Sequence, residues 1–160
     1  MTLSDVRRIL VAVELDSPDA NAAVELAGMY AQASGAEVIL LHVIDAAASL
    51  SGIVPGARSE QDLEPERRLA LDKVEALVAT LHAAGIAQVS LNVEAGYPAD
   101  RILHHAQSRH SQLIVMGTHG RTGFSRLWLG SIAGVVLRGA PCQVVVTRAA
   151  KHPNSDESSE

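Results

Sequence analysis

The chain has 160 residues, of which 48% are hydrophobic, so it suits one folded domain and is not a disordered chain. Its net charge of −5 argues against a protein that binds nucleic-acid phosphates in general. Only 2% of its residues are aromatic, so it lacks the side chains on which the bases of single-stranded nucleic acids usually stack. The one cysteine, Cys142, excludes an internal disulfide and fits a reducing compartment. The first ten residues lack the apolar core of a signal peptide, and no apolar run is long enough to span a membrane. We therefore expect a cytoplasmic protein with neither a nucleic-acid nor a membrane partner.

Strand and helix patterns alternate along the chain. In order, they predict a strand over 9–13 (ILVAV), a helix over 19–33, a strand over 37–44 (EVILLHVI), a helix over about 62–84, a strand over 88–93 (QVSLNV), a helix over 98–109, a strand over 112–116 (QLIVM), a helix over 131–138 and a strand over 143–147 (QVVVT). The helix over 62–84 has Leu63, Leu69 and Val74 among its apolar positions, and the helix over 19–33 has Met29.

Three of the strands are nearly continuous apolar runs, which is typical of strands covered on both faces. The run 88–93 alternates, which places it nearer an edge. Strand–helix alternation with right-handed crossovers predicts an α/β fold with an open, doubly wound parallel sheet. Ligands in such sheets bind at the carboxyl ends of the strands, where the strand order reverses. For 45–61, a surface loop is favoured over a mobile flap. We expect 151–160, KHPNSDESSE, to be a disordered acidic tail that follows a single domain over 1–150.

A glycine-rich segment, MGTHGRTGFSRLWLGS over 116–131, follows the fourth predicted strand. Gly117, Gly120 and Gly123 are three residues apart, and Gly130-Ser131 opens a predicted helix. Glycines let backbone N–H groups approach a ligand closely, and a helix N-terminus adds unpaired donors. Phosphate is therefore the expected ligand. The segment is not a Walker loop, a GxGxxG dinucleotide loop or a GxSxG nucleophile elbow. A tight turn without a ligand stays open as an alternative.

The full spacing G-x2-G-x9-G-[S/T] is present without a gap in Gly117, Gly120 and Gly130-Ser131. With the surrounding MGTHGRTG, it resembles the nucleotide-binding signature of the universal stress protein family. The resemblance covers 7–148 and includes the opening ILVAV, the LLHVID strand end, the Gly96-Tyr97-Pro98 turn and the closing APCQVVV.

The resemblance implies a Rossmann-like five-stranded sheet in the order 3-2-1-4-5, with helices on both faces. It implies that ATP, or AMP or ADP, binds across the first and fourth strands, with or without Mg²⁺, and that the chain forms a homodimer through Gln143 to Thr147. At the nucleoside, it implies contacts from Ala12, Val13, Glu14, Val43, Met116 and Gly117. At the phosphates, it implies contacts from Gly120, Gly130, Ser131 and Ile132.

One position departs from the family pattern. ATP-binding members usually carry Asp after the first strand, where this chain has Glu14. A carboxylate there accepts a hydrogen bond from a ribose hydroxyl or the adenine amine, and the longer Glu can do so from a shifted position. Asp16 is the second candidate for this role.

Other polar residues favour plainer interpretations. His104, His105 and His110 are expected to be surface histidines, because no cysteine or carboxylate completes a metal-ligand set. His42 is expected to be a satisfied core residue, and Cys142 an inert core thiol. For Arg121 and Arg126, solvated charge is favoured over phosphate contact.

The sequence thus predicts a cytoplasmic nucleotide-binding stress protein, which regulates a stress response through nucleotide occupancy and an unknown protein partner. No residue supplies an obvious base to activate water, so no catalytic residue is assigned and catalysis ranks below binding. A slow ATPase and a structural dimer module with an empty loop stay open as alternatives.

Overall fold

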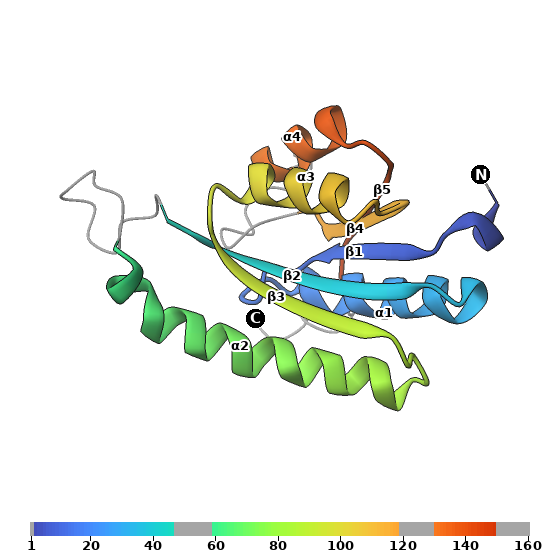
Figure 1. The fold of residues 1–160 in the computed structure, drawn as a ribbon, viewed down its shortest axis with the longest axis horizontal. Coiled ribbons are helices and arrows are strands. Elements are labelled where there is room, and N and C mark those ends of the chain that lie inside the picture. The colour runs from blue at the N-terminus through green and yellow to red at the C-terminus, as the bar shows by residue number, and fades with distance from the viewer. Residues whose placement is uncertain (1, 47–58, 119–129, 150–160) are drawn as a thin grey trace, which may run out of the picture.

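The structure is a computed structural model that describes residues 2–46, 59–118 and 130–149. Helices and strands alternate along these segments (Figure 1). In chain order they are η1 (Leu3–Asp5), β1 (Arg8–Ala12), α1 (Asp19–Ser34), β2 (Glu37–Asp45), α2 (Glu60–Ala83), β3 (Val89–Gly96), α3 (Pro98–Ser108), β4 (Leu113–Gly117), α4 (Ser131–Gly139) and β5 (Gln143–Thr147).

The five strands form one parallel sheet in the order β3-β2-β1-β4-β5, which confirms the predicted α/β fold and strand order. Strand β1 lies at the centre, with Ile9 opposite Val38 of β2 on one side and Leu113 of β4 on the other. The strand order reverses at β1, because β2 and β3 extend to one side and β4 and β5 to the other. The carboxyl ends of β1 and β4 are therefore the expected ligand position.

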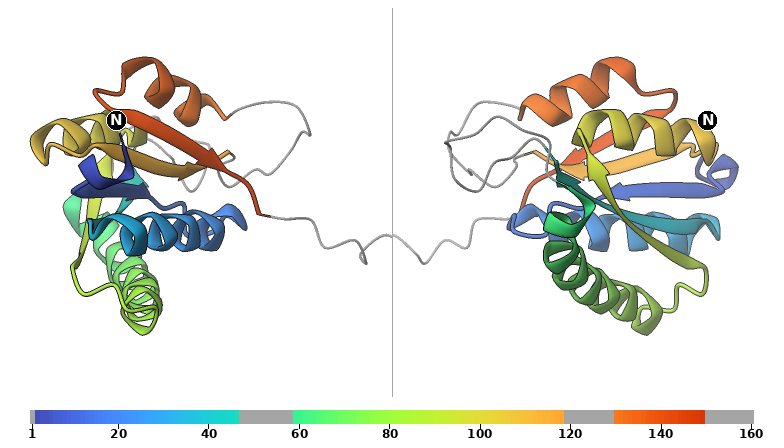
Figure 2. Two further views of the ribbon diagram at one scale, coloured as in Figure 1. Left: turned by 90° about the vertical axis from the view of Figure 1, so that its right-hand side faces the viewer. Right: turned by 60° about the vertical axis from the view of Figure 1, so that its left-hand side comes forward.

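Helices cover both faces of the sheet, as Figure 1 and Figure 2 show. One apolar cluster joins the sheet to α1 and α2, and the other joins it to α3 and α4. Alternate residues of β1 enter opposite clusters: Ile9 and Val11 enter the first, and Leu10 and Ala12 the second. This two-sided burial explains why β1, β2 and β4 are read as continuous apolar runs.

The helix boundaries follow local signals. Ser59 caps α2: its hydroxyl oxygen accepts a hydrogen bond from the Asp62 N–H, and its own backbone N–H donates to the Asp62 carboxylate. As a result, α2 begins two residues before its predicted start. Gly35, with φ of 72°, ends α1, and Pro98 is in the first turn of α3.

Two of the apolar positions named for the helices are exposed. Leu69 on α2 is 57% exposed and Met29 on α1 is 66% exposed. By contrast, Leu63, Val74 and Leu81 on α2 are buried, so this long helix packs along a narrower stripe than its apolar content suggests.

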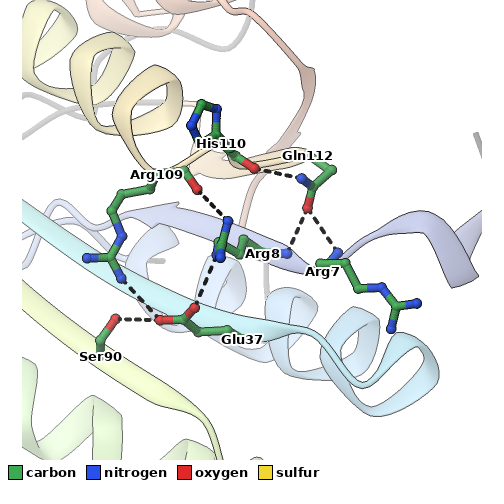
Figure 3. Close-up of polar contacts among 7 residues, drawn as sticks. All are labelled: Arg7, Arg8, Glu37, Ser90, Arg109, His110 and Gln112. Atoms are coloured by element: carbon green, nitrogen blue, oxygen red, sulfur yellow. Dashed lines mark hydrogen bonds and ion pairs between the residues drawn. The ribbon is translucent and has the colours of Figure 1, made fainter.

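Polar side chains bind the amino ends of the strands together (Figure 3). Glu37 of β2 accepts from Arg8 of β1 at 3.5 Å and from Arg109 at 3.3 Å. The Gln112 side chain, just before β4, accepts from the backbone N–H groups of Arg7 and Arg8 at 3.0 and 2.9 Å. These contacts hold the amino ends of β1, β2 and β4 in register, at the opposite end of the strands from their carboxyl ends.

Strand β5 differs from the central strands, since none of its residues is fully buried. Cys142, just before it, is half-buried rather than a core thiol. Burial still raises the pKa of the Cys142 thiol above its usual value, which favours the protonated and less reactive form.

Candidate functional site

A pocket of about 210 Å³ opens at the carboxyl ends of β1, β2 and β4, where the strand order reverses. Its apolar side is formed by residues that end or follow these strands and by the first turns of α3. Five of the residues predicted from the sequence line this side: Ala12, Val13, Glu14, Val43 and Met116. Leu41 of β2 and Ile102 of α3 add further apolar surface that the sequence analysis did not assign.

The other side of the pocket is formed by backbone at the two ends of the glycine-rich segment. Four more of the predicted residues line it: Gly117, Gly130, Ser131 and Ile132. The tenth, Gly120, lies outside the described residues, as do His119, Arg121 and Arg126. The structure thus brings together nine of the ten predicted residues in one pocket.

The N-terminus of α4 faces this pocket. The first helical hydrogen bond runs from the Gly134 N–H to the Gly130 carbonyl, so the N–H groups of the first turn have no acceptor within the helix. The positive end of the helix dipole adds to these donors. Among the described residues no Lys or Arg lines the pocket, and the donors that these residues offer to an anion include the backbone N–H groups at the start of α4 and the Ser131 hydroxyl.

Glu14 lines the pocket from the end of β1 and is only partly exposed. Asp16, the second candidate, does not line it: Asp16 is exposed and accepts a hydrogen bond from Lys73 of α2 at 2.9 Å. Of these two carboxylates, Glu14 is therefore the one that lines the pocket.

His42 contacts the backbone of Val13, which lines the pocket. Its side chain is buried, and its Nδ1 lies 2.8 Å from the Val13 carbonyl oxygen. The Val13 N–H in turn donates to the Leu41 carbonyl at 2.9 Å, which continues the β1–β2 pairing past the end of β1. His42 is thus the satisfied core residue that the sequence predicts.

The prediction of three surface histidines is wrong for His105. Its side chain is buried, and its Nε2 lies 2.5 Å from Glu94 Oε1 on β3. His105 is on the inner side of α3, whereas His104 and His110 are exposed as predicted. Within the described segments, no group of three His, Cys, Asp or Glu residues is placed to hold a metal ion.

Three polar pocket residues escaped the sequence analysis: Ser17, Asp19 and Thr118. Asp19, the first residue of α1, accepts from the Thr118 hydroxyl at 2.9 Å and from the Thr118 N–H at 3.2 Å. The two residues are 99 positions apart in the sequence, so no local signal joins them. Asp19 also occupies the space beside Gly117, where an added Cβ would come within 2.8 Å of the Asp19 Cβ.

The sequence model of the universal stress protein family matches residues 5–148. The chain belongs to this family. Its glycine-rich segment and the pocket around it are therefore features of a universal stress protein.

Individual relatives can be aligned with this chain over most of their own length. A universal stress protein of Thermus aquaticus is 32% identical over 143 residues, which cover 89% of this chain and 98% of that one. The solved structure of UspA from Lactobacillus plantarum has a TM-score of 0.74 at 27% identity, with 89% of this chain and 98% of that chain covered.

Two further solved structures of this fold are titled as nucleotide complexes. A universal stress protein in complex with cAMP has a TM-score of 0.68 at 20% identity and covers 91% of this chain and 98% of its own. One from Archaeoglobus fulgidus in complex with dAMP has a TM-score of 0.59 at 20% identity and covers 88% and 96%.

Over the described residues, no helix combines the length and the apolar character that crossing a membrane requires.

Proposed function

We propose that this universal stress protein binds an adenine nucleotide, with ATP as the expected ligand, in the pocket at the carboxyl ends of β1 and β4. The observation that carries the proposal is the two-sided lining of the pocket. Apolar residues such as Val13, Val43 and Met116 offer a surface for the base, and the N-terminus of α4 offers donors for phosphate. The cAMP and dAMP in the two titled complexes are both adenine nucleotides.

In this proposal the protein acts in the cytoplasm as a single domain over 1–150. Nucleotide occupancy changes the surface that it presents to a partner protein or to a second copy of itself. Mg²⁺ is commonly bound through substrate phosphates, so in this proposal any Mg²⁺ ion accompanies the phosphates of ATP. We propose binding rather than hydrolysis, and a phosphate-release assay on the purified protein separates the two.

The proposal is tested by thermal unfolding with and without ATP. A ligand at 100 times its dissociation constant stabilises the folded state by about 2.7 kcal/mol. For a chain of this size, this corresponds to an increase of roughly 5–10 °C in the melting temperature. Mass spectrometry of the freshly purified protein identifies any nucleotide that it retains. An unchanged melting temperature with ATP, AMP and cAMP, and no retained nucleotide, would instead support a structural module.

Replacement of Glu14 tests the nucleoside end of the pocket. If its carboxylate accepts from a ribose hydroxyl or the adenine amine, Glu14→Ala weakens ATP binding by about 1–3 kcal/mol. Asp16→Ala is the matched control, because Asp16 is exposed and paired with Lys73, and it should leave the affinity unchanged. Isothermal titration calorimetry measures both. Loss of affinity in Asp16→Ala with none in Glu14→Ala would transfer the role to Asp16.

A further inference from the structure

Asp19 is a buried carboxylate at the point where the pocket meets the ends of the last two strands. Its side chain is almost inaccessible, with 3% of the residue exposed. One carboxylate oxygen, Oδ2, accepts from the Thr118 hydroxyl at 2.9 Å and from the Thr118 N–H at 3.2 Å. The other oxygen, Oδ1, accepts from the Ala149 N–H at 2.8 Å, two residues past the end of β5. The carboxylate therefore connects the start of α1 to the ends of both β4 and β5.

Thr118, which donates to Asp19, also forms backbone hydrogen bonds with Gly130 before α4 and with Thr147 of β5. The Thr118 carbonyl accepts from the Gly130 N–H at 2.9 Å, which joins the two ends of the glycine-rich segment just before α4 begins. The Thr118 N–H also donates to the Thr147 carbonyl of β5 at 3.0 Å. Displacement of Thr118 would therefore move Gly130, and with it the first turn of α4.

Close packing leaves Asp19 little freedom. A Cβ on Gly117 would lie 2.8 Å from the Asp19 Cβ, a distance that real Cβ atoms do not show, so glycine at 117 is what lets Asp19 approach the end of β4. The side chain of Ser17 accepts from the Asp19 N–H at 3.2 Å and fixes the backbone from which the carboxylate extends. A buried charge without partners would be costly, and here three donors and the N-terminus of α1 compensate it.

We propose that Asp19 is the positioning residue of the phosphate end of the pocket. Its carboxylate holds Thr118, and through Thr118 it holds Gly130 and the N-terminus of α4, in the arrangement that receives a phosphate. Of the residues assigned to the nucleoside end, Ala12, Val13, Glu14 and Val43 lie on β2 or at the end of β1, and only Met116 and Gly117 belong to β4. We therefore expect the nucleoside end to depend on Asp19 less than the phosphate end does. The inference rests on the proposed function. It states that the contribution of the phosphates to ATP affinity depends on Asp19, because Asp19 positions the groups that receive them.

The test compares ATP with adenosine, which has the same base and sugar but no phosphate. Loss of a group that orients binding residues typically costs about 10- to 100-fold in affinity, so Asp19→Ala should weaken ATP binding at least about tenfold. Adenosine binding should change less than about twofold, because most of its expected contacts come from residues of β2 and the end of β1 rather than from Thr118 and α4. Asp16→Ala is the matched control: Asp16 precedes the same helix but is exposed and outside the pocket, and it should leave both affinities unchanged.

A second pair of variants keeps the test valid if Asp19→Ala does not fold. Thr118→Val replaces the hydroxyl that donates to Asp19 with a methyl group of similar shape, and Thr118→Ser retains it. We expect Thr118→Val to lower the ratio of ATP to adenosine affinity and Thr118→Ser to preserve it. Amide exchange without ligand supplies a further readout, since the N–H groups of Gly130 and Ala149 should exchange faster in Asp19→Ala while those of β2 stay protected.

The outcomes separate the inference from the proposed function. If the wild-type protein binds ATP and folded Asp19→Ala and Thr118→Val keep its ratio of ATP to adenosine affinity, Asp19 has only a structural role and the inference is overturned. An equal loss of ATP and adenosine affinity would also overturn it, because the whole pocket would then depend on Asp19. A wild-type protein that binds neither ligand overturns the proposed function itself.

Discussion

Gly130→Val is expected to abolish measurable ATP binding and to leave the domain folded. Gly130 lines the pocket as the residue before α4, so a branched side chain there would stand between a phosphate and the N–H groups of the first helical turn. The backbone does not need glycine at this position. Its φ of −55° and ψ of 152° lie in a region that all residues adopt, and the variant therefore loses the ligand rather than the fold.

Thermal unfolding checks this expectation. Saturating ATP should raise the wild-type melting temperature by roughly 5–10 °C and should leave that of Gly130→Val unchanged. Gly134→Ala, one turn further along α4, is the matched control. A Cβ there meets nothing closer than the Arg138 side chain at 3.5 Å, so the variant should keep the ATP response. Calorimetry that finds the wild-type affinity in folded Gly130→Val would show that phosphate does not bind at α4.

The fold was predictable because its strands and helix ends have local causes. Strands such as β1 and β4 are buried on both faces, so their apolar runs are unbroken and easily recognised. Gly35 and Pro98 mark the end of α1 and the start of α3 through their own backbone preferences. Most boundaries therefore fell within one or two residues of the prediction.

The sequence is least informative for side chains whose environment is set by distant contacts, as the wrong prediction for His105 shows. His105 is on α3, and its burial depends on Glu94 of β3, which no helical spacing reveals. Leu69 satisfies the apolar pattern of α2 but points away from the sheet, since α2 buries only a narrow stripe. In both cases the residue type was compatible with either environment, and tertiary packing decided between them.

The pocket was predictable only in part, for a related reason. Gly117, Gly130 and Ser131 belong to one continuous motif, so their spacing was sufficient to find them. Asp19 has no such motif and is recognisable from the sequence only as an acidic residue in the first turn of a helix. Its role depends on Thr118, 99 residues away, and on Ala149, 130 residues away.

The two edges of the sheet differ in how they are protected. At β3, the Arg67 guanidinium of α2 donates to the Val93 carbonyl at 3.0 Å and so covers a backbone acceptor. At β5, the strand itself has no Pro or Lys, and its valines are only partly buried. An apolar edge of this kind readily pairs with another strand, and two-fold pairing with a second copy would satisfy its open backbone groups. We therefore expect dimerisation through β5.

The structure identifies which residues of β5 face that edge. The Thr147 carbonyl accepts from Thr118, beyond the end of β4, and backbone groups of successive residues point to opposite sides of a strand. Thr147 and Val145 therefore direct their backbone groups toward β4, and Val144 and Val146 direct theirs outward. A proline at 145 would break the pairing within the sheet. A proline at 144 would remove an outward donor for which the described residues provide no strand partner.

Val144→Pro is therefore expected to shift the protein from dimer to monomer while keeping the domain folded. The wild-type protein should have about twice its chain mass of 16.8 kDa in solution, and the variant should approach the mass of a single chain. Light scattering at tens of micromolar measures both masses, with circular dichroism to verify folding.

Val145→Pro is the contrasting variant, since it should instead lower the melting temperature by removing a β4–β5 hydrogen bond. Val144 is paired with Ile114, which does not line the pocket, so a dimer loss in Val144→Pro can be separated from any change in ATP affinity. A wild-type protein of single-chain mass, or a fully dimeric Val144→Pro protein, would show that β5 is not the dimer interface.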